Sequence, residues 1–341
     1  MEMPPDERES VQPPALRVFS HGTRVGIAAL VNIGPYIQIA RPSHWFKNVF
    51  MAPGILLVYF FDPGHWHPAQ VVTILLGFVC ACLVSSSNYV LNEILDAPKD
   101  TFHPEKQFRP IPSGEASVPL AYAEWLILAF AGLGIGVWIS PMLGLSALAL
   151  WVMGALYNVP PIRLKDRAYS DVLSESVNNP IRLAIGWYAT GHGSAPTLSV
   201  VVAYWMFGSF LMAMKRFAEY RTINDPDLAA KYRKSFGYYN EERLVESMFF
   251  YGALFGMLSG VFIARYHVEL VLAAPVVAYA MAYYMHLGFK PDSPVQNPEL
   301  LYRQKKLMVI VLLAFTTCTI LLFTDVPAFT NWFNPWLTPP S

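Results

Sequence analysis

Two aspartates at the end of a long apolar segment are the residues best suited to chemistry in this sequence. Asp96 and Asp100 follow that segment together with Asn92 and Glu93. Asn92, Asp96 and Asp100 are four residues apart, so they share one face if the helix continues. Carboxylates near bilayer depth are costly and usually mark a functional site. Such oxygen ligands suit Mg²⁺, which proteins hold with one or two carboxylates together with substrate phosphates.

Basic residues directly downstream supply what a diphosphate would need. The segment continues with His103-Pro104, Lys106 and Arg109-Pro110. We expect Lys106 and Arg109 to bind phosphate oxygens, Arg109 through its two-pronged guanidinium group. A metal at the carboxylates would stabilise charge on a leaving pyrophosphate. The alternative is a solvated helix end with ordinary capping charges.

A second candidate precedes the first apolar segment, where Arg41-Pro42-Ser43-His44-Trp45-Phe46-Lys47-Asn48 combines bases and aromatic rings. His44 and Trp45 are typical of anchoring at the membrane interface. Lys47 lies deeper, where an unpaired ammonium group is expensive, so we expect it to contact phosphate and to act in catalysis.

A third candidate is a polar stripe that enters the fifth apolar segment. Asp171, Glu175, Asn178 and Arg182 recur at steps of three and four residues, so they share a helical face that must point into the bundle or a wet cavity. Ion pairing of Arg182 with Asp171 or Glu175 is the structural alternative. The loop before the stripe contributes further candidates: Tyr157, Asn158, Arg163, Lys165 and Asp166.

A fourth candidate lies at the end of the sixth apolar segment. Lys215, Arg216 and Glu219 continue that segment, and Arg233-Lys234-Ser235 follow in the next loop. The general excess of bases in cytoplasmic loops explains much of the loop charge. The three residues that continue the helix are the better candidates for binding a substrate.

Composition places these residues in a polytopic membrane protein. Of 341 residues, 54% are hydrophobic and 14% are charged, well below the share of charged residues in soluble domains. With about 20 apolar residues per span, nine transmembrane helices are predicted. They cover 44–61, 69–97, 118–139, 141–158, 170–190, 197–222, 243–264, 268–288 and 304–323.

The basic residues set the predicted orientation. With the N-terminus in the cytoplasm, most Lys and Arg residues fall on the cytoplasmic side, and 62–68, 191–196 and everything after Lys306 contain none. All four candidates then lie at the cytoplasmic face of the plasma (inner) membrane. The predicted division is an N-terminal flexible or interfacial segment (1–40), a nine-helix transmembrane domain (41–325) and a short non-cytoplasmic tail (326–341).

Together these motifs resemble the UbiA superfamily of intramembrane prenyltransferases. Within that superfamily, the sequence resembles the branch that transfers phosphoribosyl groups to polyprenyl phosphates. The resemblance lies in the acidic motif, the entry segment from Arg41 to Asn48, the tail from His103 to Gly114 and the segment from Lys215 to Glu219. The resemblance covers roughly residues 40–325. Glu93 departs from the family's usual Asp, and Lys215 to Glu219 stands where aromatic prenyltransferases carry a second DxxxD motif.

The resemblance implies an all-α bundle that transfers 5-phosphoribosyl from phosphoribosyl diphosphate to a polyprenyl phosphate. It implies Mg²⁺ at Asp96 and Asp100, with Asn92 and Glu93 assisting. It also allows a homotrimer and implies no nucleic-acid partner. By the same resemblance, Lys47, Lys106 and Arg109 would bind the donor diphosphate, and Lys165, Lys215 and Arg216 would bind the 5-phosphate or the lipid phosphate. Asp171 and Asn178 would hold ribose hydroxyls or organise the bases. Further contacts with substrate are expected at Tyr157, Asn158, Arg182 and Glu219.

Two alternatives stay open. The same metal motif would serve transfer of a prenyl group from a prenyl diphosphate to an aromatic or other small polar acceptor. The missing second DxxxD motif argues against that reaction. A transporter that uses the acids as ion sites would need inverted repeats and acids at the midplane. The acids lie at one face instead.

Overall fold

Long helices make up most of the chain, as the apolar segments predict. The computed structural model describes residues 32–101 and 106–329, and within these ranges all regular structure is helical. Seven helical stretches there are long and apolar enough to cross a membrane, so the protein is an integral membrane protein. They are α3 (Gln70–Asp100), α4 (Val118–Ile139), α5 (Pro141–Asn158), α8 (Leu198–Ile223), α10 (Glu241–Tyr266), η6 (Val268–Ala273) with α11 (Ala274–Gly288), and α12 (Lys305–Leu322).

The first predicted span, 44–61, is not one α-helix. It consists of a 3₁₀ helix, η1 (Pro42–Met51), followed by α2 (Ala52–Phe61). A 3₁₀ helix rises about 2.0 Å per residue and an α-helix about 1.5 Å, so the two together extend about 35 Å. The hydrocarbon core of a bilayer is about 30 Å thick, so this interrupted segment is still long enough to cross it.

The fifth predicted span, 170–190, is also interrupted. It forms α6 (Ser170–Ser176) and α7 (Asn178–Ala189), which meet at Val177. The polar stripe predicted on one continuous helix is therefore divided between two helices. Val177 itself keeps helical backbone angles (φ −61°, ψ −20°), so the interruption is a single turn residue, and the three residues on either side of it are buried or half-buried.

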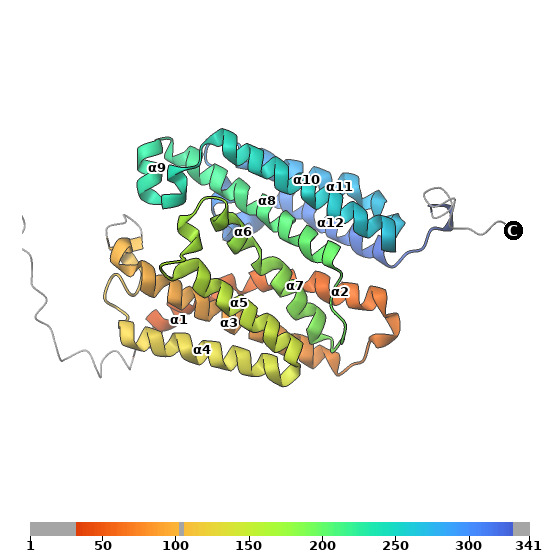
Figure 1. Cartoon of the computed structure of the whole chain (residues 1–341), viewed down its shortest axis with the longest axis horizontal. Coiled ribbons are helices and arrows are strands. Elements are labelled where there is room, and N and C mark those ends of the chain that lie inside the picture. Colours follow the sequence, from red (N-terminus) through yellow and green to blue (C-terminus); the bar gives the residue numbers. More distant parts are fainter. Residues whose placement is uncertain (1–31, 102–105, 330–341) are drawn as a thin grey trace, which may run out of the picture.

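The helices lie side by side, with their axes close to the long axis of the molecule (Figure 1). One apolar core joins α8, α10, α11 and α12, and another joins α3, α4, α5 and α7. Short helix α1 (Gly34–Ala40) precedes η1, and other short elements connect the longer helices: η2 (Pro63–His65), η3 (Lys106–Phe108), η4 (Leu164–Asp166), α9 (Pro226–Tyr232), η5 (Lys234–Gly237), η7 (Pro294–Gln296) and η8 (Pro298–Arg303).

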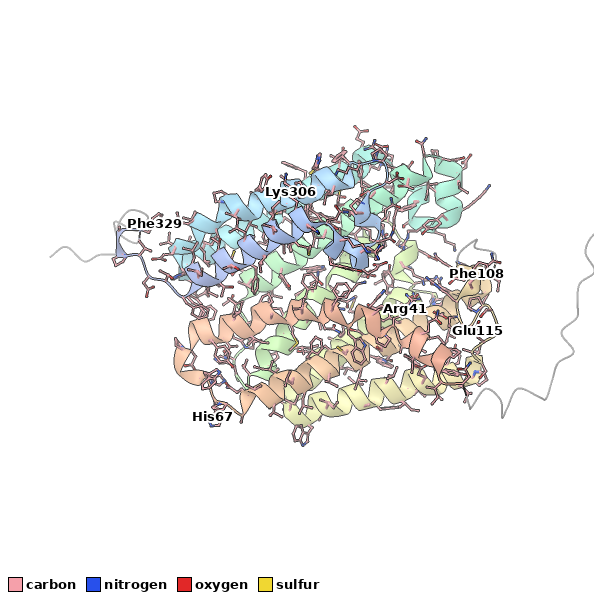
Figure 2. The ribbon with its side chains drawn as sticks, turned by 180° about the vertical axis from the view of Figure 1, so that it is seen from behind. Arg41, His67, Phe108, Glu115, Lys306 and Phe329 are labelled. Atoms are coloured by element: carbon pink, nitrogen blue, oxygen red, sulfur yellow. The ribbon has the colours of Figure 1, made fainter. Side chains whose placement is uncertain are left out.

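The loops that carry the candidate residues gather at one end of the bundle. Figure 2 shows Arg41, Phe108 and Glu115 at that end, while His67 and Phe329 lie at the other. This is the separation that the distribution of bases predicts. Orientation in the membrane stays a prediction. So does the three-part division of the chain, because 1–31 and 330–341, which make up most of the predicted terminal segments 1–40 and 326–341, lie outside the described residues.

A close crossing of α2 and α7 fixes the entry segment against the bundle. A Cβ atom on Gly54 would lie 2.0 Å from the carbonyl oxygen of Leu183, and one on Gly186 would lie 2.1 Å from that of Met51. Only hydrogen fits at either glycine, as at other close helix crossings in membranes. The crossing holds η1, which carries Lys47, beside α7.

Candidate active site

The acidic motif (Asn92 to Asp100) contacts the loop that follows α5. Helix α3 continues through Pro98 to Asp100, so the predicted spacing on one helix is confirmed. Asp96 accepts hydrogen bonds from Lys165 Nζ at 2.7 and 2.8 Å and from Arg163 Nη2 at 2.8 Å. Asn158 Oδ1 accepts from Lys165 Nζ at 2.9 Å and from the side chain of Asn92.

The other two acids of the motif have different partners. Asp100 accepts a 2.6 Å hydrogen bond from Arg109. Glu93 lies 3.4 Å from the guanidinium group of Arg41 and accepts a bond from the backbone N–H of Ile111 at 3.4 Å. Its side chain, only 2% exposed, ties α3 to the end of α1 and to the loop after η3. Glu93 and Asp96 therefore point to different neighbours.

Burial lowers the pKa of two bases beside the motif. The pKa of Lys165 falls to about 8 because burial penalises its charge, although the neighbouring Asp96 offsets part of that effect. Burial also lowers the pKa of Lys106, against the attraction of Asp100. The Lys106 ammonium lies 5.0 Å from the ring centre of Tyr232 in α9. The His103-Pro104 part of the predicted tail lies outside the described residues.

A second ionic cluster surrounds Asp171. Its carboxylate is fully buried and accepts bonds from Arg216 at 3.0 Å, Ser235 at 3.2 Å and Tyr239 at 2.7 Å. Arg233 lies 3.5 Å away. With these partners and no exposed surface, Asp171 is placed to orient the bases, and a ligand has no open approach to it.

Arg216 links this cluster to the end of α8. Its guanidinium group donates to Glu219 at 2.9 Å and to Tyr157 Oη at 3.5 Å, and Lys215 lies 3.7 Å from Glu219. Lys215 is a quarter exposed, whereas Arg216 is almost fully covered. We call Lys215 and Arg216 the basic wall.

The side chains of η1 fall into rows, because residues three apart align in a 3₁₀ helix. Trp45, Asn48 and Met51 form the row directed into the protein, and Trp45 Nε1 donates to Ser86 at 2.9 Å. Asn48 Oδ1 accepts from Arg182 Nε at 2.8 Å. Arg182 therefore pairs with Asn48, rather than with Asp171 or Glu175 as the structural alternative supposed.

Lys47 belongs to a half-buried row of η1 and has no hydrogen bond or ion pair within the described residues. The nearby charges that act on it include Glu175 and Lys215. Asn178, at the start of α7, has a buried Oδ1 atom without a hydrogen-bond partner in the described part of the chain. Both side chains thus retain capacity to bind a ligand.

The residues present fit Mg²⁺ by their chemistry. In the described ranges, no three His, Cys, Asp or Glu side chains converge into a complete metal site. Magnesium does not need one, since one or two carboxylates suffice when substrate phosphates complete the coordination. Asp96 and Asp100, one helical turn apart, could supply that pair. If Mg²⁺ took the place of their basic partners, Lys165 and Arg109 among them, those bases would be available to phosphate oxygens.

The family model of the UbiA prenyltransferase family matches residues 50–303, which is more than half of the chain. The chain belongs to the UbiA prenyltransferase family. Similar UbiA-family relatives include the decaprenyl-phosphate phosphoribosyltransferases of Mycolicibacterium smegmatis (31% identical, covering 61% of this chain and 63% of that protein) and Corynebacterium glutamicum (28% identical, 58% of each). Protoheme IX farnesyltransferase 2 of Pseudomonas paraeruginosa is 26% identical over 57% of this chain and 64% of that protein.

The chain thus spans about three fifths of the length of the curated relatives it matches. A UbiA homologue from Archaeoglobus fulgidus, solved with DMAPP and Mg²⁺, has a TM-score of 0.62 at 17% identity and covers 85% of this chain and 100% of its own. At that identity the likeness establishes the fold, and it confirms the predicted UbiA-like architecture.

The sequence names Arg163 and Arg233 among the loop residues near the site but predicts no role for either. Arg163 contacts Asp96, and Arg233 lies beside Asp171. For Arg233, the general excess of bases in cytoplasmic loops is an equally good explanation of its presence. The distinguishing feature of both residues is a pairing with an acid more than 60 residues away in the sequence. No local motif encodes that pairing.

Proposed function

We propose that this protein transfers the 5-phosphoribosyl group of phosphoribosyl diphosphate to a polyprenyl phosphate and releases pyrophosphate. The observation that carries the proposal is the basic wall. Lys215 and Arg216 stand where an aromatic prenyltransferase would carry its second acidic motif, and Arg216 is fixed by Asp171 and Glu219. A wall of fixed cations suits a second phosphate-bearing substrate better than a neutral aromatic ring.

The donor diphosphate is assigned to the acidic motif and its tail. Arg109 is fixed beside Asp100, and Lys106 is under the influence of both Asp100 and Asp96. Asp96 and Asp100 would hold Mg²⁺, which when bound would offset the charge on the departing diphosphate. Glu93 faces Arg41 and Ile111, so we assign it to positioning the phosphate-binding tail.

The acceptor is assigned to the opposite side, at Lys47 and the basic wall. A phosphate monoester is already an anion near neutral pH, so its oxygen attacks the anomeric carbon without a strong general base. What the residues contribute is positioning and charge complementarity. Asn178 Oδ1, which has no partner among the described residues, is assigned to a ribose hydroxyl. Asp171 is a positioning residue that acts through Arg216 and Arg233.

The test is a transfer assay with purified protein, Mg²⁺, labelled phosphoribosyl diphosphate and a polyprenyl phosphate. We expect label in the lipid fraction and release of pyrophosphate. Lys215→Gln should raise the KM for the lipid phosphate about ten-fold, because it removes one charge-assisted contact. Lys290→Gln, a change at an exposed base after α11, is the matched control and should leave KM unchanged. Product formed only from a prenyl diphosphate and an aromatic acid would refute the proposal.

A further inference from the structure

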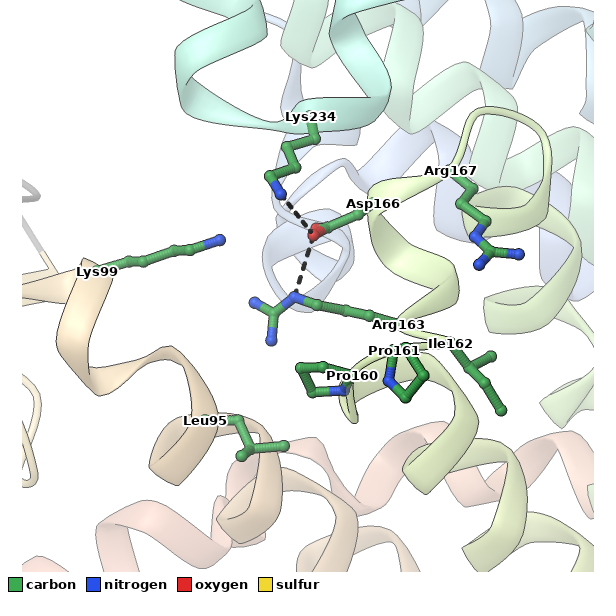
Figure 3. Close-up of a pocket in the computed structure, with 9 residues that line it drawn as sticks. All are labelled: Leu95, Lys99, Pro160, Pro161, Ile162, Arg163, Asp166, Arg167 and Lys234. Atoms are coloured by element: carbon green, nitrogen blue, oxygen red, sulfur yellow. Dashed lines mark ion pairs between the residues drawn. The ribbon is translucent and has the colours of Figure 1, made fainter.

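A surface pocket lies beside the acidic motif, at the end of the bundle that carries the candidate site. Its volume is about 470 Å³, and three separate segments form it: the end of α3, the loop from α5 to η4, and η5. Figure 3 shows Lys99 directed from α3 toward Arg163 and Asp166, with Lys234 above them. We call this space the basic pocket. Its volume lies in the range of small-molecule sites.

The residues that line the basic pocket carry an excess of positive charge, which favours an anionic ligand. Four of its lining residues are basic (Lys99, Arg163, Arg167 and Lys234) and one is acidic (Asp166). Asp166 lies 3.2 Å from Arg163 and 3.7 Å from Lys234. Lys99 and Arg167 have no ion pair within the described ranges. The surplus of positive charge calls for an anion with more than one negative charge, which a phosphoryl group provides.

Arg163 connects the basic pocket to Asp96. Its two terminal nitrogens donate hydrogen bonds, Nη2 to Asp96 at 2.8 Å and Nη1 to the carbonyl oxygen of Asn158 at 3.1 Å. Its buried Nε faces Asp166 without the geometry of a hydrogen bond. The Arg163 backbone lies in the left-handed region at φ 32°, which is costly for a residue other than glycine and recurs at ligand sites. Arg163 thus stands between a carboxylate of the candidate site and an open basic pocket.

We propose that the basic pocket binds a multiply charged phosphoryl anion and that binding draws Arg163 from Asp96 toward the anion. This binding site is separate from the diphosphate position assigned at Asp96 and Asp100. It does not depend on which group the enzyme transfers. Two sources carry the required chemistry: a soluble phosphate or pyrophosphate, and the phosphate headgroup of a lipid at the membrane surface.

Lysine labelling followed by mass spectrometry locates such binding directly. In neutral detergent without Mg²⁺, inorganic pyrophosphate should slow acetylation of Lys99 and Lys234 and leave Lys290, an exposed base outside the pocket, unchanged. Arg167→Ala should raise the half-protecting concentration about ten-fold. Asp166→Asn should lower it about three-fold, because the competing acid is gone. These exposed or half-exposed positions lie outside the membrane cores, so the variants should fold.

A second arm separates the two sources. The protein is placed in vesicles of phosphatidylcholine alone or with phosphatidic acid, and Lys99 and Lys234 are labelled again. Protection by pyrophosphate supports a soluble ligand, and protection by phosphatidic acid alone supports a lipid headgroup. Equal labelling under all conditions, or protection that Arg167→Ala and Asp166→Asn do not change, overturns the proposal. Because the readout is protection and not turnover, it is independent of the transfer assay.

Discussion

The α2–α7 crossing gives a prediction whose magnitude follows from the structure. In Gly54→Ala the new Cβ would lie 2.0 Å from the carbonyl oxygen of Leu183, and in Gly186→Ala it would lie 2.1 Å from that of Met51. Real Cβ contacts are essentially never shorter than 3.0 Å, so the two backbones must separate by about 1 Å. Overpacking in a close-packed interior costs about 1–3 kcal/mol, and backbone atoms cannot move aside as side chains do. We expect each variant to lose about 3 kcal/mol of stability.

The assay is thermal unfolding in detergent, followed by tryptophan fluorescence, together with turnover at the temperature where the wild type is fully folded. Both variants should unfold at a lower temperature and lose activity, because separation of α2 from α7 displaces η1 and Lys47. Gly256→Ala in α10 is the matched control, since its Cβ meets nothing within 4 Å. If Gly54→Ala and Gly186→Ala were both as stable as Gly256→Ala, the close crossing would not exist in the protein.

Substitutions at three further positions test the site. Asp96→Asn should reduce transfer at least about 100-fold and abolish Mg²⁺ binding in the presence of donor; near-normal turnover in the labelled-lipid assay would contradict its assignment. Glu93→Gln should leave the half-saturating Mg²⁺ concentration unchanged and lower stability by about 1–3 kcal/mol through loss of its pairing with Arg41, as measured by thermal unfolding; a large rise in the Mg²⁺ requirement would return Glu93 to the metal. Asn48→Leu should cost about 1–3 kcal/mol by leaving Arg182 without its acceptor, while Asn48→Asp keeps it; equal unfolding temperatures for the two variants would exclude that role.

Hydropathy predicted where helices lie but not how they are built. The segments that became α3, α4, α5 and α8 were placed within a few residues, because long apolar runs leave no alternative in a membrane. The 3₁₀ geometry of η1 and the break at Val177 were missed. A 3₁₀ helix and an α-helix can have the same apolar content, so hydropathy does not distinguish them. The choice between them depends on contacts with α3 and α7 that adjoining sequence does not reveal.

The sequence predicts those features of the site that depend on spacing within one helix, and it does not predict contacts between residues far apart in the chain. The spacing of Asp96 and Asp100 is a property of one helix, so sequence was sufficient. The partners of those acids come from elsewhere in the chain: Arg163 is a candidate by sequence, but only the fold reveals its contact with Asp96. Glu93 is the clearest example of a residue whose contacts the sequence does not predict. Its carboxylate neighbours the motif in sequence, but its contacts connect it to α1 and the loop after η3.

The 3₁₀ geometry of η1 has a mechanical consequence. Each residue that changed from 3₁₀ to α would shorten the segment by about 0.5 Å, so a full change over Pro42–Met51 would retract it by about 5 Å. It would also turn Lys47 by about 100° relative to Pro42, since the two helices differ by about 20° per residue. The hydrogen bonds of Trp45 to Ser86 and of Asn48 to Arg182 keep η1 in the longer 3₁₀ form. The direction in which Lys47 points is therefore set by the winding of its helix as much as by its position in the chain.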